Sequence, residues 1–599
     1  MKYFYNLRKT KARTVSKNIQ HKILQKKRKN NKWKNWVTPS KTRNYILDDL
    51  IADILYHRKF NISNGTCGNG GNNSSCFILE QGNEFEKVVV KLLKQKFTNE
   101  IEDIYGDSLP RSYVFADKTV EAMENGVPII VSPVFHDFDS KVYGVPDLLV
   151  RSDYMAKIFK DPQPMPSEGC KFSDKWHYVV VDIKFSTLYL RSNGVELLNQ
   201  ENFKAFKGQL WLYTNILGKI QGYNPKKAYI LGRTFSFKNS KDGEIRGNGC
   251  FDKPGVIDYD GWDHGYNRTV KKAVRWMKHC KRIAPTFTVN DIYKSKYNLF
   301  PNMCVDNLFV QKEKWLVANA INDISMLPYC GVKQRNNALS QGIKGWTNPK
   351  CNSSTLGFKP DSHHGRIVDS CLEANRGNKL FVVKPSTQHP NLLDLSKIPD
   401  KEKYYIDFEM VSNVCDDFST MPAPSTMDLA FMLTVGYYNE KKRFVTKTFT
   451  AQGLTPEFER EMFVDAMKVI NLKNATIIHW GHCDKNEWRK IERKYGLSYE
   501  PKMWFNAHQA VQNNALGING CFNYSLKSVN NALYRKGLVN HEFTNNEHGL
   551  EAMHQAYVAH MESEGDVFIN HHYIRTLKDY NVKDVIALKE VTKFLETLM

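Results

Sequence analysis

Two strongly apolar stretches of this 599-residue chain carry charged residues at positions where a strand would be buried. The stretch YVVVDIK contains Asp182 and Lys184, and the stretch KYYIDFE contains Asp407 and Glu409. In each pair the residues are two positions apart, so their side chains leave the strand on the same face. A buried charge costs on the order of several kcal/mol unless it is paired or binds a metal. The sequence therefore predicts an α/β protein whose central strands hold functional charges.

Further acids flank the first of these stretches. Glu86 lies on an expected amphipathic helix, with Glu84 close by as an alternative, and Asp147 follows G-V-P directly before an apolar strand. Carboxylates from a helix and two strands offer the oxygen ligands that Mg²⁺ or Mn²⁺ prefers, and we predict that Glu86, Asp147 and Asp182 bind the metal. Such a metal would activate water and stabilise charge on a phosphate. Lys184 beside it could orient or deprotonate that water, or steady the scissile phosphate.

A helix expected over residues 203–217 adds two polar side chains, Gln209 and Tyr213, one turn apart. They could fix Lys184 or a DNA phosphate. The order of acidic helix, G-V-P-D, D-I-K and Q-x-x-x-Y resembles the RecB-like clan of the P-D-(D/E)-x-K nuclease superfamily over about residues 76–237. The resemblance implies a central mixed sheet flanked by helices, two-metal cleavage of phosphodiesters, and DNA as the substrate.

The twelve cysteines include no C-x-x-C pair, which argues against a disulfide framework and most zinc ribbons. CRISPR-associated members of the RecB-like clan hold an iron–sulfur cluster with closely spaced cysteines. The cysteines that follow the nuclease core in this chain are instead far apart: Cys250, Cys280, Cys304 and Cys330. We therefore expect no iron–sulfur cluster. We also expect no zinc, since the histidines lack ligand spacing.

The second charged stretch belongs to a longer pattern near the C-terminus. A strand expected over 475–480 leads into the turn G-H-C-D, and the last helix begins with a tyrosine and an aspartate one turn apart. Four carboxylates with a phenol above them describe a two-metal site with a group that orients the attacking water. The pattern resembles the DEDD exonucleases of the RNase H-like superfamily over about residues 403–599. The residues that match that motif are Asp407, Glu409, Asp484, Tyr580 and Asp584.

Asp484 has a near alternative in Glu487, and Asn506 could stand where an acid was lost. The second domain is therefore expected to be either a further exonuclease or a module that holds substrate, whereas the first domain is expected to cleave DNA. Residues 348–400 are rich in Asn, Ser, Pro and Gly and are expected to form a linker. Such a linker would keep the two centres separable.

Residues 327–343 resemble a helix-hairpin-helix, in which backbone N–H groups of a glycine turn bind a phosphate. Gly331 and Lys333 are the expected DNA contacts, and because Cys330 replaces the usual glycine, a packing element is the alternative. Residues 238–268 are expected to form a surface insertion. The expected organisation is a basic arm and loop (1–75), a nuclease domain (76–285), a helical connector (286–350), a linker (351–402) and an RNase H-like domain (403–599).

The chain is strongly basic, with a formal net charge of +22. Excess positive charge attracts phosphate backbones through counterion release and without reading sequence. Residues 1–36 contain no acid, and they include the basic cluster Lys26, Lys27, Arg28 and Lys29. This arm is expected to grip DNA, with a solvated tail or a nuclear address as the alternatives.

Together these features predict a multidomain α/β, metal-dependent DNA nuclease, acting as an exonuclease and in the alternative also as an endonuclease. The resemblance implies a role in viral DNA processing or in defence against foreign DNA. No stretch of the sequence is apolar enough to cross a membrane. We expect a reducing intracellular compartment, in the cytoplasm or nucleus of a host cell or in a virion, and leave a homo-oligomer open. The rival functions are an RNA-processing exonuclease driven by the RNase H-like domain, and a nucleic-acid-binding scaffold with idle sites.

Deleting residues 1–36 should weaken DNA binding and flatten its dependence on salt, with little effect on the turnover of bound substrate. Each lost phosphate contact lowers the slope of log K against log salt by about one. Fluorescence anisotropy of a labelled duplex over a series of salt concentrations measures this slope. An unchanged slope would assign the arm to a solvated tail or an address.

Overall fold

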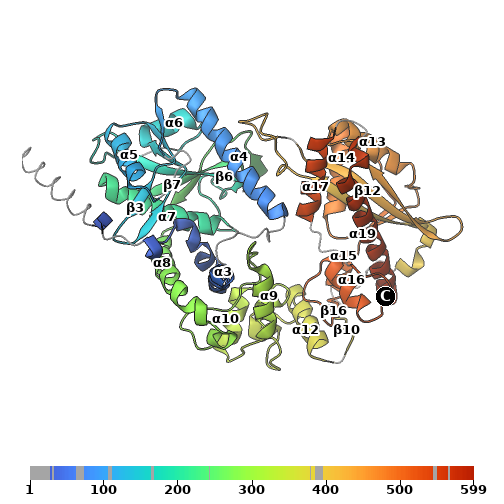
Figure 1. The fold of residues 1–599 in the computed structure, drawn as a ribbon. Helices are drawn as coiled ribbons and strands as arrows, with labels where there is room; N and C mark the ends of the chain where they lie inside the picture. The colour runs from blue at the N-terminus through green and yellow to red at the C-terminus, as the bar shows by residue number, and fades with distance from the viewer. Residues whose placement is uncertain are drawn as a thin grey trace, which may run out of the picture.

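The structure, a computed structural model, describes residues 27–29, 33–62, 73–104, 111–163, 168–200, 202–241, 243–377, 379–384, 395–425, 427–543, 549–563 and 567–598. Over these residues helices and strands build a mixed α/β protein, with two sheet-containing lobes joined by a helical connector (Figure 1). Among the residues described, none of the helices combines the length and the apolar character needed to span a membrane.

The first lobe is built on a mixed sheet. Its strands run in the order β1 (Ile101–Asp103), β2 (Ile129–Val131), β5 (Leu148–Arg151), β6 (Tyr178–Tyr189), β7 (Lys227–Asn239) and β8 (Gly243–Arg246), and β9 (Gly255–Asp258) also pairs with β7. β6 lies antiparallel to β5 but parallel to β7. Parallel neighbours need a crossover connection, and α7 (Phe203–Gln221) provides it.

Alternate residues of the central strand β6 face two different helices. Val180 shares a core with Leu210 of α7, whereas Val181 shares a core with Val89 of α4 (Asn73–Lys96). Because side chains alternate along a strand, a strand covered on both faces must be apolar throughout. This is why YVVV precedes Asp182, and why a charge at that point lies deep in the lobe.

Shorter elements complete the first lobe: η1 (Trp33–Asn35), η2 (Pro39–Thr42), α2 (Arg43–Ile46), α5 (Tyr113–Glu124), β3 (Phe135–Asp137), β4 (Val142–Gly144), η3 (Ser152–Tyr154) and α6 (Met155–Ile158). One expectation is wrong here, because residues 238–268 are not simply a surface insertion. β9 lies within them, pairs with β7 and buries Val256 and Ile257. The polar turns around this short strand dominate the local composition and concealed it.

The connector consists of helices that pack against the base of the first lobe. Its elements are α3 (Leu50–Ile62), α8 (Tyr266–Ile283), η4 (Ala284–Thr286), η5 (Val289–Ile292), α9 (Gln311–Ala320), η6 (Ile324–Met326) and α10 (Val332–Ser340). A buried ion pair fixes α9, because Lys314 Nζ lies 3.0 Å from Asp49 Oδ2 and both side chains are fully buried. Lys314 also donates to the Asn302 carbonyl at 3.1 Å.

The expected linker, residues 351–402, is folded over most of the part that the structure describes. It contains α11 (Ser353–Leu356), α12 (His363–Arg376), β10 (Phe381–Val382), η7 (Leu395–Lys397) and η8 (Asp400–Glu402). α12 buries Val368 and Leu372, which are one helical turn apart. The polar residues that suggested a linker instead form helix caps. Asn352 and Ser362 each accept a backbone hydrogen bond at the first turn of α11 and α12, respectively.

The second lobe holds a five-stranded sheet in the order β13 (Phe444–Thr450), β12 (Leu429–Tyr438), β11 (Lys403–Val411), β14 (Thr476–His479) and β15 (Met503–Asn506). β11 is central, antiparallel to β12 and parallel to β14. One core includes α13 (Pro456–Met467), α14 (Cys483–Tyr495) and α17 (Gly549–Glu562). The other includes α15 (Ala507–Asn513) and α16 (Leu526–Tyr534), and α19 (His572–Glu596) contributes to both. α18 (Val567–Asn570) and the pairing of β10 with β16 (Gly517–Ile518) complete the lobe.

The two lobes also pack directly on each other. The segment that follows β11, residues 412–425, places Phe418 in the core of the first lobe. The ring of Phe418 lies 6.2 Å from that of Phe85 on α4 and 5.6 Å from that of Phe185 on β6, between centroids. In the same segment the carbonyl of Pro422 accepts a hydrogen bond from the Cys250 N–H at 2.9 Å.

The beginning of α4 makes the reciprocal contact. Phe77 is buried in a core of the second lobe and stacks on His554 of α17, with ring centroids 4.5 Å apart. Farther along, the same helix carries Glu86 and packs in the first lobe. An aromatic ring from each lobe therefore packs in a core of the other. The two lobes are not independently packed units, as a flexible linker between them would have implied.

Phe418→Ala should destabilise the contact between the lobes. Truncating a buried phenylalanine typically costs about 3–5 kcal/mol through lost burial and the cavity left behind. We expect a lower melting temperature in calorimetry, and a transition that broadens or splits as the two lobes begin to unfold separately. Met561→Ala, on the exposed face of α17, is the control and should melt like the wild type. A Phe418→Ala protein that also melted like the wild type would show that this contact does not hold the lobes together.

Candidate active sites

The acids and the lysine predicted in the first lobe come together at the ends of β5 and β6. Lys184 Nζ lies 2.6 Å from Asp182 Oδ2 and 3.5 Å from Asp147 Oδ2. Asp147 also accepts a hydrogen bond from the Ile183 N–H at 2.5 Å. Glu86, on α4, is close enough for its charge to act on Lys184 and Asp182. Two acids thus contact one lysine and a third lies near enough to sense its charge, but the oxygens of these three acids do not all come within 4.8 Å of one another.

Burial and charge determine how these groups titrate. Burial, followed by the charge of Asp182, raises the pKa of Asp147 well above its usual range. Burial likewise raises the pKa of Glu86. Burial alone would lower the pKa of Lys184, but the charges of Asp147 and Asp182 outweigh it and raise the pKa. Lys184 is therefore a cation that compensates the acids, and in this state it orients groups rather than accepting protons.

The two polar residues predicted on α7, Gln209 and Tyr213, lie beside this site. Tyr213 shares a side-chain hydrogen bond with Gln209, and burial followed by the charge of Asp182 raises the tyrosine pKa well above its usual range. The Tyr213 hydroxyl donates to the carbonyl of Val145 at 3.2 Å. That bond fixes the G-V-P-D turn, so Tyr213 positions Asp147 through the backbone.

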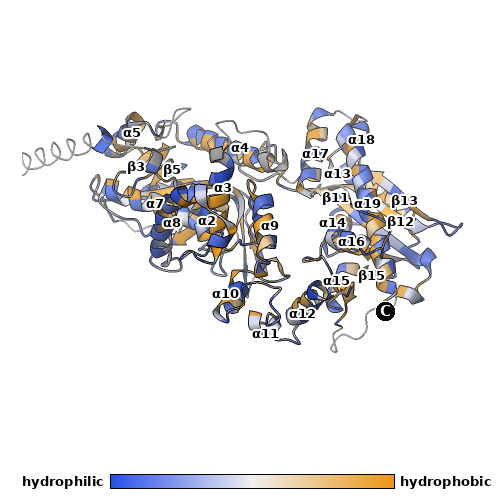
Figure 2. Ribbon diagram, turned by 60° about the horizontal axis from the view of Figure 1, so that its bottom comes forward, coloured by the Kyte–Doolittle hydropathy of each residue, from blue (hydrophilic) through white to orange (hydrophobic). Residues whose placement is uncertain are grey.

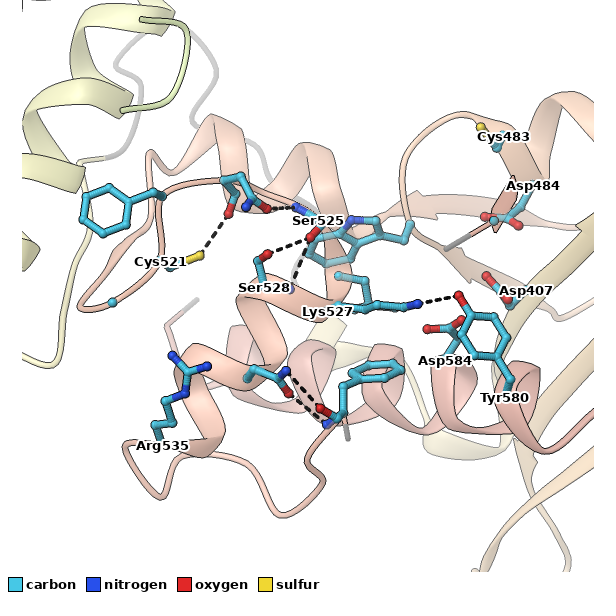
Figure 3. A pocket seen from close by; sticks show the side chains of 18 of the residues that line it. Asp407, Cys483, Asp484, Cys521, Ser525, Lys527, Ser528, Arg535, Tyr580 and Asp584 are labelled. Carbon is cyan, nitrogen blue, oxygen red and sulfur yellow. Dashed lines mark hydrogen bonds between the residues drawn. The ribbon is translucent and has the colours of Figure 1, made fainter. Parts of the chain in front are cut away.

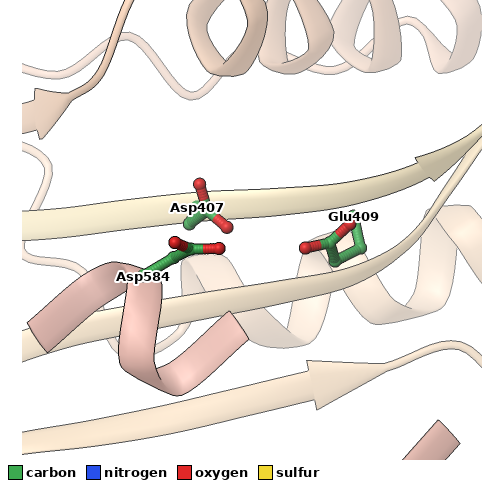
Figure 4. A group of neighbouring side chains, drawn as sticks. All are labelled: Asp407, Glu409 and Asp584. Carbon is green, nitrogen blue, oxygen red and sulfur yellow. The ribbon is translucent and has the colours of Figure 1, made fainter. Parts of the chain in front are cut away.

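In the second lobe three predicted acids form a tighter group (Figure 4). Asp407 and Glu409 of β11 and Asp584 of α19 each place a carboxylate oxygen within 4.8 Å of the others, which no other trio of histidine, cysteine or acidic residues does in the described chain. A fourth acid, Asp484 on α14, accepts a hydrogen bond from the Phe408 N–H at 3.2 Å. This bond holds Asp484 against the same strand.

Two residues that the sequence did not single out complete this group. The Asn581 side-chain amide donates to Asp407 Oδ2 at 2.6 Å and to Glu409 Oε1 at 3.5 Å. Lys527, on α16, donates to the Tyr580 hydroxyl at 2.5 Å and lies 4.2 Å above the centre of that ring. Asn581 directly follows the motif tyrosine, which is a weak signal. Lys527 is one of 85 lysines and arginines and stands in no motif, so only the fold could reveal it.

The acids of the second lobe repel one another in a buried place. Burial, followed by the charges of Asp584 and Asp484, raises the pKa of Asp407 well above its usual range. Burial and then Asp584 raise the pKa of Glu409 to about 8. Burial raises the pKa of Asp484 to about 7 and that of Asp584 to about 6. Lys527 opposes the shifts at Asp407 and Glu409 without cancelling them.

This acidic group opens into a cavity of about 860 Å³ (Figure 3). Asp407, Asp484, Tyr580 and Asp584 lie at one end, and Lys527 reaches toward them from α16. Arg535, at the end of α16, lines another part of the cavity. The site is therefore open to a ligand much larger than an ion.

Nearby alternatives that the sequence left open have other roles in the structure. Glu84 is exposed and pairs with Lys87 at 3.1 Å. Glu487 pairs with Lys490 at 2.7 Å. Asn506 caps α15 by accepting a hydrogen bond from the backbone at its first turn. The matched motif acids are thus the ones that the fold brings together.

The hairpin of the connector packs against the protein through Cys330, and its contact with DNA stays a prediction. Cys330 is buried in an apolar core. The Gly331 N–H, which was expected to bind a phosphate, donates to Gln334 Oε1 at 3.1 Å. Lys333 is exposed. The physical reason is the cysteine, whose side chain turns the hairpin toward the protein interior.

Two members of the basic cluster make contacts within the first lobe. Lys27 pairs with Asp139 at 2.6 Å, and Arg28 pairs with Asp117 at 2.5 Å. Lys26 lies outside the described residues. Surface ion pairs of this kind are weak, at roughly 0–1 kcal/mol, so they do not prevent these side chains from binding DNA. That the basic arm binds DNA stays a prediction.

Cysteines that are far apart in sequence lie close in the fold. Cys330, Cys351 and Cys371 share one core, and Cys304 Sγ lies 3.4 Å from the Cys330 carbonyl oxygen. Burial raises the thiol pKa of Cys330 and Cys371. The ten cysteines that the structure describes are free. The expectation that the chain holds neither zinc nor an iron–sulfur cluster stays a prediction.

Comparison with protein-family models and with curated proteins finds no match to this chain. The functional argument therefore depends on the geometry of the two acidic sites. What the fold defines is a mixed α/β protein with one acidic group on the central strand of each sheet.

The raised carboxylate pKa values predict how the stability of the metal-free protein depends on pH. The folded state holds these protons more tightly than the unfolded chain, so the contribution of these acids to the free energy of unfolding falls as pH rises from about 4 toward about 8. Because protons compete with metals for carboxylates, Mn²⁺ should raise the melting temperature more at about pH 8 than at about pH 5.5. Asp584→Asn removes a repelling charge and should raise the melting temperature in EDTA near pH 8.

Thermal melts in EDTA and in Mn²⁺ check both statements, with Glu440→Gln on an exposed turn as the control. Asp584→Asn should also weaken the response to Mn²⁺, because one ligand has lost its charge. An equal response to Mn²⁺ at both pH values, or an Asp584→Asn protein that melts below the wild type in EDTA, would contradict the assignment.

Proposed function

We propose that this chain is a metal-dependent nuclease that hydrolyses phosphodiester bonds of DNA at two carboxylate centres, with Mg²⁺ or Mn²⁺. The observation that carries the proposal is the trio Asp407, Glu409 and Asp584 beside a cavity of about 860 Å³. Structural acids are normally paired with basic groups or left in water. Here three acids lie within 4.8 Å of one another, and two of them, Asp407 and Asp584, line a space that can admit a substrate.

The donor set fits a hard divalent cation. Mg²⁺ and Mn²⁺ prefer carboxylate oxygens, and acids whose pKa values are raised by burial and mutual repulsion gain most from an added positive charge. Asp407, Glu409 and Asp584 would hold the metal, with Asp484 at its side. When bound, such a metal supplies activation of water and stabilisation of negative charge on the phosphate.

The chain's own residues would position the reactants. Asn581 holds the carboxylates of Asp407 and Glu409 in place through its amide. Tyr580 presents its hydroxyl toward the cavity and can orient a water, while Lys527 directs positive charge to the same point. A fixed cation beside a phosphate stabilises charge that develops during cleavage.

The first lobe supports a second nuclease centre of the same class. Its metal ligands would be Glu86, Asp147 and Asp182, and Lys184 would face the scissile phosphate. The strand order around β6, with α7 as the crossover, agrees with the proposed P-D-(D/E)-x-K fold. The order around β11 agrees with the proposed RNase H-like fold.

RNA is the rival substrate, and it is favoured by one observation: the better-assembled acidic trio lies in the lobe proposed to be RNase H-like. A scaffold with idle sites is the third candidate. It would not need three mutually repelling acids beside one another. Parallel digestion of DNA and RNA separates these possibilities.

The two centres should each account for a metal-dependent activity. Asp407→Asn with Glu409→Gln should reduce cleavage at the second centre on the order of a thousandfold, and Asp182→Asn should do the same at the first. Distant sites act additively, so the combined variant should lose both activities. The measurement is cleavage of end-labelled single-stranded DNA, duplex DNA and RNA in Mg²⁺ and in Mn²⁺.

Glu440→Gln again serves as the control, and melting temperatures verify that each variant is folded. If Asp407→Asn with Glu409→Gln cleaved every substrate as the wild type does, the second centre would be idle. If this double change alone removed all cleavage, the first centre would be the idle one. A wild-type protein inactive on all three substrates would overturn the proposed function.

A further inference from the structure

The cavity over the second centre has a wall that comes from the connector. Most of its lining belongs to the second lobe, but Met303, Trp315, Ser325 and Met326 also line it. α9, which carries Trp315, stands between the two lobes (Figure 1 and Figure 2). The space above the acids is thus shared between a catalytic lobe and a helix that neither motif includes.

Trp315 is presented to this space by the way α9 is anchored. Its neighbour Lys314 is fully buried and paired with Asp49 at 3.0 Å, which fixes the rotation of the helix about its axis. Trp315 follows about 100° farther around the helix, and it is 52% exposed while lining the cavity. An exposed tryptophan on a rigid helix is a flat apolar surface available to a ligand.

Another part of the cavity wall is basic. α16 carries Lys527 at its beginning and Arg535 just after its end, and both line the cavity. The two residues are eight positions apart, which corresponds to about 12 Å along the axis. Two cations at such a spacing can contact two non-adjacent phosphates of one strand. The acids of the second centre lie beyond Lys527 (Figure 3).

We propose that α9 forms one side of a substrate channel, and that Trp315 stacks on a base of an unpaired nucleic-acid strand whose end reaches the acidic trio. This inference rests on the proposed nuclease function. Lys527 and Arg535 contact the phosphates, and Trp315 contacts the face of a base. Cavities of roughly 300–1,000 Å³ enclose ligands of drug size, so this one has room for a few nucleotides of one strand.

Stacking is also what makes the channel selective. A base exposes its face only when the strand is unpaired at that point, whereas phosphates are exposed in both single strands and duplexes. A tryptophan that shares a cavity with two cations therefore distinguishes an unpaired end from a paired one without reading sequence. Trp315 is in this sense a specificity residue of the connector, and it takes no part in the chemistry.

The test measures binding and cleavage with the full-length protein. The probe is a short single-stranded oligodeoxynucleotide with 2-aminopurine near one end, compared with a blunt duplex of the same sequence. Binding is measured in EDTA, which removes the metal needed for cleavage, and kinetics are measured in Mn²⁺. The variants are Trp315→Ala and Trp315→Phe. Leu316→Ala is the matched control, because Leu316 is 55% exposed on the same helix but does not line the cavity.

Trp315→Ala should weaken binding of the single strand by about 5- to 150-fold, which corresponds to the ~1–3 kcal/mol found for stacking of one base on an aromatic side chain. KM should rise with little change in kcat, and duplex binding should stay as in the wild type. Trp315→Phe should restore most of the affinity because its ring still stacks. Leu316→Ala should behave as the wild type.

Single-strand binding by Trp315→Ala at wild-type strength would overturn the channel, even if cleavage still required Asp407. Equal weakening for the single strand and the duplex would also overturn it, since Trp315 would then be a general contact. Conversely, a wild-type protein that cleaves nothing, but whose single-strand binding and 2-aminopurine quenching require Trp315, would sink the nuclease proposal and support the channel.

Discussion

Charged residues in the central strand of each sheet impose the constraint on which both lobes depend. β6 and β11 are covered by helices on both faces, so any charge there must be neutralised locally. In the first lobe Lys184 lies 2.6 Å from Asp182 and offsets part of the negative charge, yet burial and the charge of Asp182 still raise the pKa of Asp147. In the second lobe Lys527 likewise offsets only part of the charge, and burial raises the pKa of Glu409 to about 8. Each centre therefore retains acids whose charge is not fully compensated.

A similar device holds the acids in both lobes. In each, a helix that crosses the end of the central strand supplies a neutral hydrogen-bonding group: Tyr213 on α7 fixes the turn before Asp147, and Asn581 on α19 holds Asp407. Neutral donors position an acid without cancelling its charge. α7 is itself secured by a fully buried ion pair between Lys207 and Asp263 at 2.7 Å.

The parts of the sites that lie on regular elements could be predicted from the sequence. Asp407 and Glu409 share a strand face because they are two residues apart, and Tyr580 and Asp584 share a helix face because they are four apart. Lys527 could not be predicted, since its place depends on how α16 packs against α19. The fold of residues 351–402 was missed for another reason: helix caps and linkers are made of the same polar residues, and only the packing of α12 separates them.

Phe418 links the contact between the lobes to the acidic centre of the first lobe. Its ring lies against Phe85, the neighbour of Glu86, and against Phe185, the neighbour of Lys184. Residues 412–425, which follow β11 of the second lobe, therefore pack beside the acidic centre of the first lobe. A gene fragment that ended before residue 403 would expose those two rings to water, and its product would tend to self-associate. A substitution in α4 or in residues 412–425 would therefore alter the packing of both lobes.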